Sequence, residues 1–168
     1  MKPEMDHEKE YAPEERVAAL LRQHGYTITT AESCTGGLLA GRLVNAAGIS
    51  DVFKEGYITY SNEAKVKLVS VSQDTLAAYG AVSEQTAQEM AQGAAKAAGA
   101  DVALATTGIA GPDGGTAQKP VGLVYVGCFI QGVTVVEQHL FAGDRAQVRS
   151  MSVEAALSLA QRCIAGMS

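Results

Sequence analysis

The stretch DVALATT, residues 101–107, is apolar over most of its length, and the glycine-rich segment 108–115 follows it directly. A strand with one solvated face alternates apolar and polar residues, whereas a nearly continuous apolar run is typical of a strand buried on both faces. Such a strand needs a layer of helices on each side of its sheet. The stretch therefore predicts a central strand of an α/β fold.

Helical and extended patterns alternate around this strand. Before it, the sequence predicts strands over 26–31 and 56–60 and helices from Pro13 to a stop at Gly25, over 38–45, over 63–68, from Ser72 and over 83–98. After it, the sequence predicts a β-hairpin of strands 121–129 and 133–140 and a last helix over 144–164. This order implies a three-layer α/β/α sandwich around a mixed sheet.

Length and charge limit the possible functions. The chain has 168 residues, which suits one domain. We expect a flexible, charge-dense tail over 1–12 and a single domain over 13–168. Lys and Arg total 13 against 18 Asp and Glu, and the aromatic residues are six Tyr and three Phe without Trp. An acidic chain with few aromatic rings is not expected to bind nucleic acid.

The sequence also argues against membranes, export and metals. No apolar run is long enough to span a bilayer, and the charged start is unlike a signal peptide. Three widely spaced cysteines, Cys34, Cys128 and Cys163, favour reduced thiols. We therefore expect a cytoplasmic protein. Because CxxC and HExxH are missing and the histidines are scattered, we expect no structural zinc site. We also expect no other metal and no cofactor.

Three loops follow the carboxyl ends of predicted strands, at 32–37, 61–65 and 107–115. In open α/β sheets, ligands bind outside the carboxyl ends of the strands. We therefore expect the functional residues to lie in these loops.

Ser33 lies in the first loop, between a strand and a helix. A helix start offers unpaired amides and a positive dipole, so a hydroxyl there could attack a carbonyl while nearby N–H groups stabilise the oxyanion. The same position also suits a serine that only caps the helix. Cys34 is a rival nucleophile, or a small buried thiol.

A nucleophilic serine needs a base, and Lys65 is the best candidate. The G-x-S-x-G motif is absent, and neither His24 nor His139 is clearly placed for a triad. Lys65 lies one helical turn after Ser61, but it serves as a base only where burial or a nearby cation lowers its pKa. It could equally be a surface lysine. Tyr60 could relay protons, orient the lysine or simply pack.

The third loop carries four glycines after the buried strand, with the spacing G-x-x-G-x-x-G. It is neither a Walker A loop nor G-x-G-x-x-G. The glycines favour backbone amides brought close to an anion or polar ligand, and a mobile loop is the alternative. Arg145 could add a cation for a phosphate, or be a solvated residue beside a helix cap.

Together these segments resemble one known family. The segments AESCTGG (31–37), YSNEAK (60–65), GAVS (80–83), TGIAGPDGG (107–115), KPVG (119–122) and GDR (143–145) are similar to the CinA C-terminal domain family. The resemblance extends over about residues 13–165 and implies the stand-alone form, without the additional N-terminal domain of full-length CinA.

The resemblance implies an activity. Members of the family are nicotinamide mononucleotide deamidases, which hydrolyse the carboxamide to nicotinate mononucleotide and ammonia in pyridine nucleotide recycling. The family is similar to other serine amidases, which use Ser with Lys and Tyr and no metal. By matching motif, Ser33 would be the nucleophile, Lys65 its general base and Tyr60 the proton relay. The expected substrate-binding residues are Thr35, Gly36, Thr107, Gly108, Ile109, Ala110, Gly111 and Arg145.

Two other functions stay open from the sequence. One is a nucleotide-binding regulatory module without catalysis, in which Ser33 only caps a helix. The other is a hydrolase that uses Cys34. In each case the expected ligand is a small molecule. By analogy with the family, we also expect the chain to form a homodimer.

Overall fold

The structure is a computed structural model, and it describes residues 11–167. Residues 1–10 of the predicted tail lie outside the described residues. The two remaining residues of that tail, Tyr11 and Ala12, directly precede the first helix.

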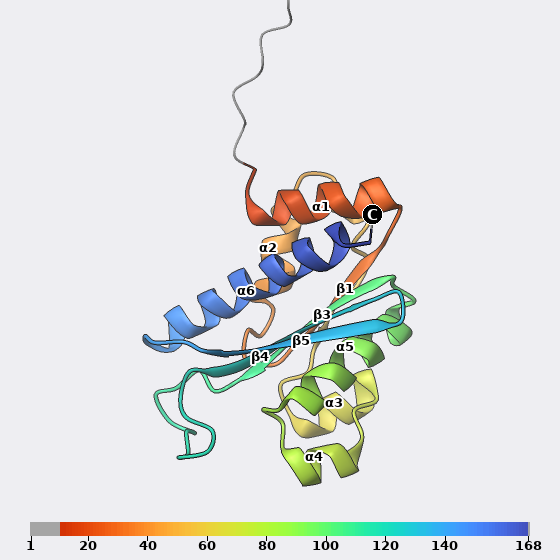
Figure 1. Cartoon of the computed structure of the whole chain (residues 1–168). Coiled ribbons are helices and arrows are strands. Elements are labelled where there is room, and N and C mark those ends of the chain that lie inside the picture. The colour runs from red at the N-terminus through yellow and green to blue at the C-terminus, as the bar shows by residue number, and fades with distance from the viewer. Residues whose placement is uncertain (1–10, 168) are drawn as a thin grey trace, which may run out of the picture.

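A mixed sheet forms the centre of the molecule (Figure 1). Its strands are β1 (Ile28–Glu32), β2 (Tyr57–Ile58), β3 (Val102–Gly108), β4 (Leu123–Ile130) and β5 (Val133–Leu140). Their spatial order is β2-β1-β3-β4-β5. Strand β1 pairs in parallel with β2 and β3, whereas β4 pairs antiparallel with β3 and with β5. The predicted mixed sheet is confirmed.

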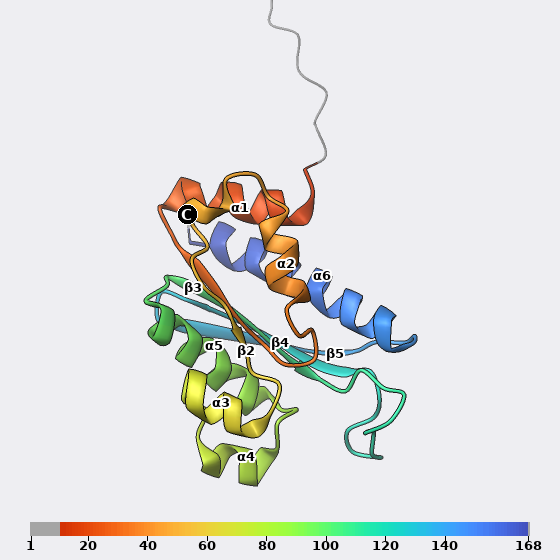
Figure 2. The same cartoon turned by 180° about the vertical axis from the view of Figure 1, so that it is seen from behind.

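Helices cover both faces of the sheet. They are α1 (Pro13–His24), α2 (Leu38–Val44), α3 (Asn62–Val69), α4 (Gln73–Tyr79), α5 (Glu84–Ala98) and α6 (Arg145–Ala165), with a short 3₁₀ turn, η1 (Ile49–Asp51). Helices α1, α2 and α6 lie on one side, and α3, α4 and α5 on the other, as the two opposite views show (Figures 1 and 2). This is the predicted three-layer α/β/α sandwich.

Strand β3 divides its side chains between two apolar cores. Val102 and Leu104 join the core beneath α1, α2 and α6, whereas Ala103 and Ala105 join the core beneath α5. Successive residues of a strand point to opposite faces, so a strand with two cores must be apolar at consecutive positions. This is the physical reason for the DVALATT pattern.

The hairpin agrees with its prediction. Gln131 and Gly132 both have positive φ, at 48° and 79°. A two-residue turn of this kind matches the right-handed twist of the strands that it joins.

Several predicted strand boundaries were wrong. The strand expected over 101–107 is β3 at 102–108, and the hairpin strand expected over 121–129 is β4 at 123–130. The second strand was expected over 56–60, but β2 holds only Tyr57–Ile58, and the next residues leave the sheet toward α3. The first strand was expected to end at residue 31, but Glu32 is its last residue and pairs with Thr106. Because β1, β2 and β3 are parallel, their carboxyl ends meet at one edge of the sheet.

Candidate active site

A cavity of about 300 Å³ opens at this edge of the sheet. Ser33, Lys65 and Thr107 line it, one from each of the three predicted loops, together with residues that include Tyr60, Gly108, Ala110 and Arg145. The structure therefore brings the three loops together at one site.

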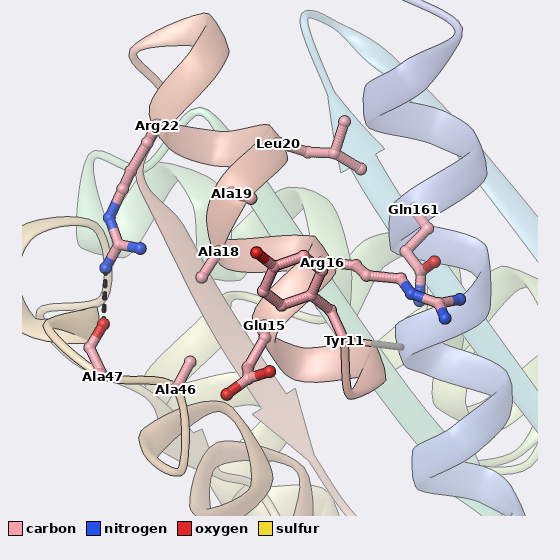
Figure 3. A pocket seen from close by; sticks show the side chains of 10 residues that line it. All are labelled: Tyr11, Glu15, Arg16, Ala18, Ala19, Leu20, Arg22, Ala46, Ala47 and Gln161. Carbon is pink, nitrogen blue, oxygen red and sulfur yellow. Dashed lines mark hydrogen bonds between the residues drawn. The ribbon is translucent and has the colours of Figure 1, made fainter. Parts of the chain in front are cut away.

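A larger cavity, of about 570 Å³, lies away from this edge, between α1 and residues such as Ala46, Ala47 and Gln161 (Figure 3). Its wall is mostly alanine and the aliphatic part of longer side chains. Arg22 contributes to the wall, but its guanidinium is bound to Asp51 and to the carbonyl of Ala47. This cavity holds no pairing of a nucleophile with a base, so the smaller one is the better candidate.

Ser33 and Lys65 are in direct contact. The Lys65 Nζ lies 2.9 Å from Ser33 Oγ and 2.7 Å from the carbonyl oxygen of Thr59. Lys65 is only 1% exposed. Burial lowers its pKa from 10.5 to about 8, because an apolar environment disfavours the charged ammonium. At pH 7 about a tenth of the amine is therefore unprotonated, and this fraction rises steeply as the pH passes 8.

The start of α3 places Lys65. Ser61 caps the helix, since its hydroxyl accepts a hydrogen bond of 3.0 Å from the Ala64 amide. Lys65 then stands one turn into the helix, with its amide bound to the Ser61 carbonyl. Side chains on a helix lean toward its N-terminus, which here faces the carboxyl end of β1. The lysine consequently reaches back to Ser33.

Cys34 is buried, and its surroundings do not activate the thiol. It is 6% exposed, and burial raises the pKa of its thiol to about 11. A protonated thiol is a poor nucleophile. The hydrogen bond from Lys65 goes to Ser33. The arrangement favours the serine.

The side chain of Glu32 stabilises the turn that follows β1. Its buried carboxylate accepts hydrogen bonds from the Thr35 hydroxyl at 2.6 Å, the Leu39 amide at 2.8 Å and the Ala40 amide at 3.0 Å. Glu32 occupies the amides of Leu39 and Ala40 at the helix start, so these two are not available to an oxyanion. Burying a carboxylate is costly, and these bonds to a helix N-terminus offset the cost.

Thr35 does not expose its hydroxyl to the cavity. The side chain is fully buried, and its oxygen contacts Glu32 and Thr106 Oγ1, the latter at 2.7 Å. Since the single proton of Thr35 goes to the carboxylate, Thr106 donates the second bond. The N–H of Thr35 has no hydrogen-bond partner among residues 11–167. A substrate contact at Thr35 would therefore involve its backbone.

Arg149 holds the same turn from the side of α6. Its Nε donates to the carbonyl of Cys34 and its Nη2 to the carbonyl of Thr35, each at 3.0 Å. The sequence reasoning did not single out this residue. It follows Arg145 by four positions on a predicted helix, so both had to lie on one helical face, and that spacing was the available signal.

Tyr60 and Arg145 meet at the mouth of the cavity. The Tyr60 side chain is 62% exposed, and its hydroxyl accepts a hydrogen bond of 3.1 Å from Arg145 Nη2. Arg145 Nη1 donates to the carbonyl of Gly111 at 2.8 Å. Within the described chain, Tyr60 makes no hydrogen bond to Ser33 or Lys65. Its role as proton relay stays a prediction.

Packing explains two of the glycines in the third loop. A Cβ on Gly108 would lie 2.6 Å from Val124 Cγ2, and one on Gly111 would lie 2.5 Å from Val121 Cγ1. They let the loop fold back on the start of β4.

The other predicted loop and turn residues take different positions. Ile109 exchanges backbone hydrogen bonds with Gly122 and Leu123. The Thr107 hydroxyl donates to the carbonyl of Ala81. Gly36 is exposed beside Arg149. Contact of Thr107, Gly108 and Ala110 with a substrate is compatible with their place in the cavity wall and stays a prediction.

Two further observations concern metal ligands and membrane-spanning helices. In the part of the chain that the structure describes, three or more His, Cys, Asp or Glu side chains nowhere gather as metal ligands would. Over the same residues, no helix is both long and apolar enough to cross a membrane.

Comparison with known proteins identifies the family. The family model of the CinA C-terminal domain matches residues 10–164 of this chain. The chain belongs to the CinA C-terminal domain family. This confirms the resemblance seen in the sequence. A CinA-like protein of Kosmotoga olearia is 56% identical over 151 residues, which are 90% of this chain and 37% of that protein. A Clostridium novyi protein named as competence-damage inducible is 62% identical over 89% of this chain and 36% of its own length.

The chain thus spans little more than a third of the curated relatives that it matches. Solved structures of the family match it almost end to end. A CinA superfamily protein of Klebsiella pneumoniae has a TM-score of 0.88 at 38% identity, covering 92% of this chain and 96% of that one. A competence/damage inducible protein of Agrobacterium tumefaciens has a TM-score of 0.82 at 41% identity, covering 89% of this chain and 94% of that one. The α/β fold is therefore that of the family.

Proposed function

We propose that this CinA-family chain is a serine amidohydrolase that converts nicotinamide mononucleotide to nicotinate mononucleotide and ammonia, in the cytoplasm. The observation that carries the proposal is the 2.9 Å contact between Ser33 Oγ and the buried Nζ of Lys65. The choice of substrate rests on the resemblance to the family, and the choice of reaction class rests on the geometry of the site.

In the proposed reaction, the neutral amine of Lys65 accepts the proton of Ser33 while Oγ attacks the carboxamide carbon. The developing oxyanion is stabilised by backbone N–H groups of the turn, of which that of Thr35 is unpaired among the described residues. The C–N bond then breaks, and the leaving nitrogen takes the proton from the Lys65 ammonium to depart as ammonia. Water hydrolyses the acyl-enzyme, with Lys65 again as the base.

The mouth of the cavity suits a phosphate. Arg145 presents a guanidinium there, and the Tyr60 hydroxyl lies 3.1 Å from it. Guanidinium groups bind phosphate through paired, charge-assisted hydrogen bonds. A cavity of about 300 Å³ is at the small end of ligand pockets, so part of a mononucleotide would extend across this mouth.

The test is ammonia release from nicotinamide mononucleotide by the purified chain, beside Ser33→Ala and Lys65→Met. We expect both variants to lose turnover while binding of the nucleotide persists in Ser33→Ala. Lys67→Met, an exposed lysine of the same helix, is the matched control and should keep the rate.

Normal turnover by Ser33→Ala would refute the nucleophile. Nucleotide binding by the parent with no ammonia release would instead support the regulatory module.

A further inference from the structure

Helix α6 carries two arginines that reach the site at different depths. Arg145 lies at the mouth of the cavity, whereas Arg149, one turn later on the same face, lies behind the turn that carries Ser33. Arg149 is not among the residues that line the cavity, and its two hydrogen bonds go to backbone carbonyls. Its contribution must therefore act through the turn.

We propose that Arg149 is a positioning residue for the hydrolysis: its guanidinium fixes the two peptide groups that hold Ser33 and present an N–H group to the oxyanion. The proposal rests on the proposed function, since it assumes that Ser33 attacks a carbonyl.

The first hydrogen bond acts on the oxyanion side. Arg149 Nε binds the carbonyl of the peptide group that joins Cys34 and Thr35. In a trans peptide group the N–H points opposite to the C=O, so the Thr35 N–H is directed away from the guanidinium. A cation bound to the carbonyl also polarises the group and makes its N–H a stronger donor.

The second hydrogen bond acts on the nucleophile side. Arg149 Nη2 binds the carbonyl of the peptide group that joins Thr35 and Gly36. The N–H of this group donates to the carbonyl of Ser33 at 3.1 Å. The guanidinium is thus linked through one peptide group to the backbone of the nucleophile.

The turn needs such a restraint because it contains two adjacent glycines. Gly36 and Gly37 both have positive φ, at 54° and 104°. Glycine reaches these angles easily but also reaches many others, so a Gly-Gly pair on its own is poorly ordered. Glu32 restrains the turn through the Thr35 side chain, and Arg149 restrains its carbonyls.

These contacts predict a kinetic signature. The aligned N–H and the oriented hydroxyl matter most when the tetrahedral intermediate forms, and much less when substrate binds. Loss of the guanidinium should therefore lower kcat and leave KM nearly unchanged. Small misplacement of reacting groups costs up to about 100-fold in rate, so we expect kcat to fall by about 10- to 100-fold.

The experiment compares Arg149→Met and Arg149→Lys with Arg162→Met. Arg162 lies on the same helix and binds Glu137 through two hydrogen bonds, so its loss removes a similar set of contacts far from the turn. kcat and KM for ammonia release are measured, together with the thermal midpoint. We expect Arg149→Lys to recover part of the rate, since an ammonium can bind only as a point charge.

A second probe does not need the nucleotide. A fluorophosphonate reacts with an activated serine: the Oγ–P bond forms, the P–F bond breaks, fluoride leaves and Lys65 takes the hydroxyl proton. The rate of Ser33 labelling, followed by intact mass, should fall by a similar factor in Arg149→Met. Guanidinium ion added at non-denaturing concentration to Arg149→Ala should restore part of this rate.

The outcomes separate the two proposals. Labelling that slows in Arg149→Met while the parent releases no ammonia would keep the positioning role and refute the substrate. A kcat and a labelling rate within twofold of the Arg162→Met control would overturn the positioning role. A raised KM with an unchanged kcat would overturn it as well. If Ser33 of the parent reacts with neither probe, both proposals fail.

Discussion

The substitution Lys65→Met should change how the stability of the protein depends on pH. Lys65 is almost completely buried, and burial lowers its pKa from 10.5 to about 8. Between these two values the unfolded chain holds a proton that the folded protein has released. Stability of the parent therefore rises with pH across this window, relative to a variant that does not titrate at this position.

The size of the effect follows from the shift. At pH 7 the amine is mostly protonated in both states, and keeping the charge buried costs about 3 kcal/mol. At pH 9.5 the folded state has lost the proton, and the cost falls to about 1 kcal/mol. Methionine removes the charge but leaves the Thr59 carbonyl without its donor, which costs about 1–3 kcal/mol at either pH.

The assay is denaturation by urea at pH 7 and pH 9.5, for the parent and for Lys65→Met. The free energy of unfolding of the parent, minus that of the variant, should increase by about 2 kcal/mol between the two pH values. Other titrating groups cancel in this difference. Lys67→Met is the control, since an exposed lysine should give almost no increase. If the difference in unfolding free energy between the parent and Lys65→Met does not change with pH, the idea of a buried, destabilised ammonium is refuted.

Four further outcomes follow from the site. The value of kcat/KM should rise as pH passes about 8, because the unprotonated amine of Lys65 is the base, and a flat profile would contradict that role. Cys34→Ala should keep ammonia release, and abolished release would reinstate the thiol as nucleophile. Arg145→Met should raise KM for the nucleotide by about 10- to 100-fold, with little change for the riboside, which lacks the phosphate; equal changes for both would exclude phosphate binding. Glu32→Gln should lower the free energy of unfolding by about 1–3 kcal/mol, since it weakens bonds to two amides, and an unchanged urea midpoint would show that the carboxylate charge is not needed.

The sequence was sufficient for the layers of the fold and for the edge of the sheet at which the three loops meet. The pairing of Ser33 with Lys65 was one of several interpretations of the residues, and the resemblance to the family favoured it. A strand buried on both faces requires helices on both sides, and parallel strands bring their carboxyl ends to one edge. Lys65 was the best candidate for the base because it lies one helical turn after Ser61, just past the second strand. Only the structure shows that Ser61 caps this helix. These inferences depend on local patterns that tertiary packing reinforces.

The sequence was not sufficient to predict which residues support the turn after β1. Glu32 looked like a loop residue, since a charged side chain is unusual inside a buried strand, and only the facing amides of α2 explain its burial. Arg149 binds the carbonyl of a residue 115 positions away in the chain. The spacing from Arg145 indicates which face of the helix Arg149 lies on, but backbone carbonyls are the same in every residue, so the sequence does not indicate which carbonyls it binds. Nor did the sequence show that Gly108 and Gly111 are crowded by Val124 and Val121, so that packing requires them whether or not they also bind a ligand.

Strand β3 pairs with one strand that is close to it along the chain and with one that is distant, and this difference has a consequence for refolding. Its antiparallel partner β4 is close along the chain, whereas the amide of Thr27, at the start of β1, bonds to Asp101 across 74 positions. Contacts between distant segments form slowly, because a long loop must close before they are gained. The C-terminal half of the sheet should therefore assemble before β1 docks, and only that late docking brings the serine to the lysine. Recovery of catalysis after dilution from denaturant should lag behind recovery of strand structure.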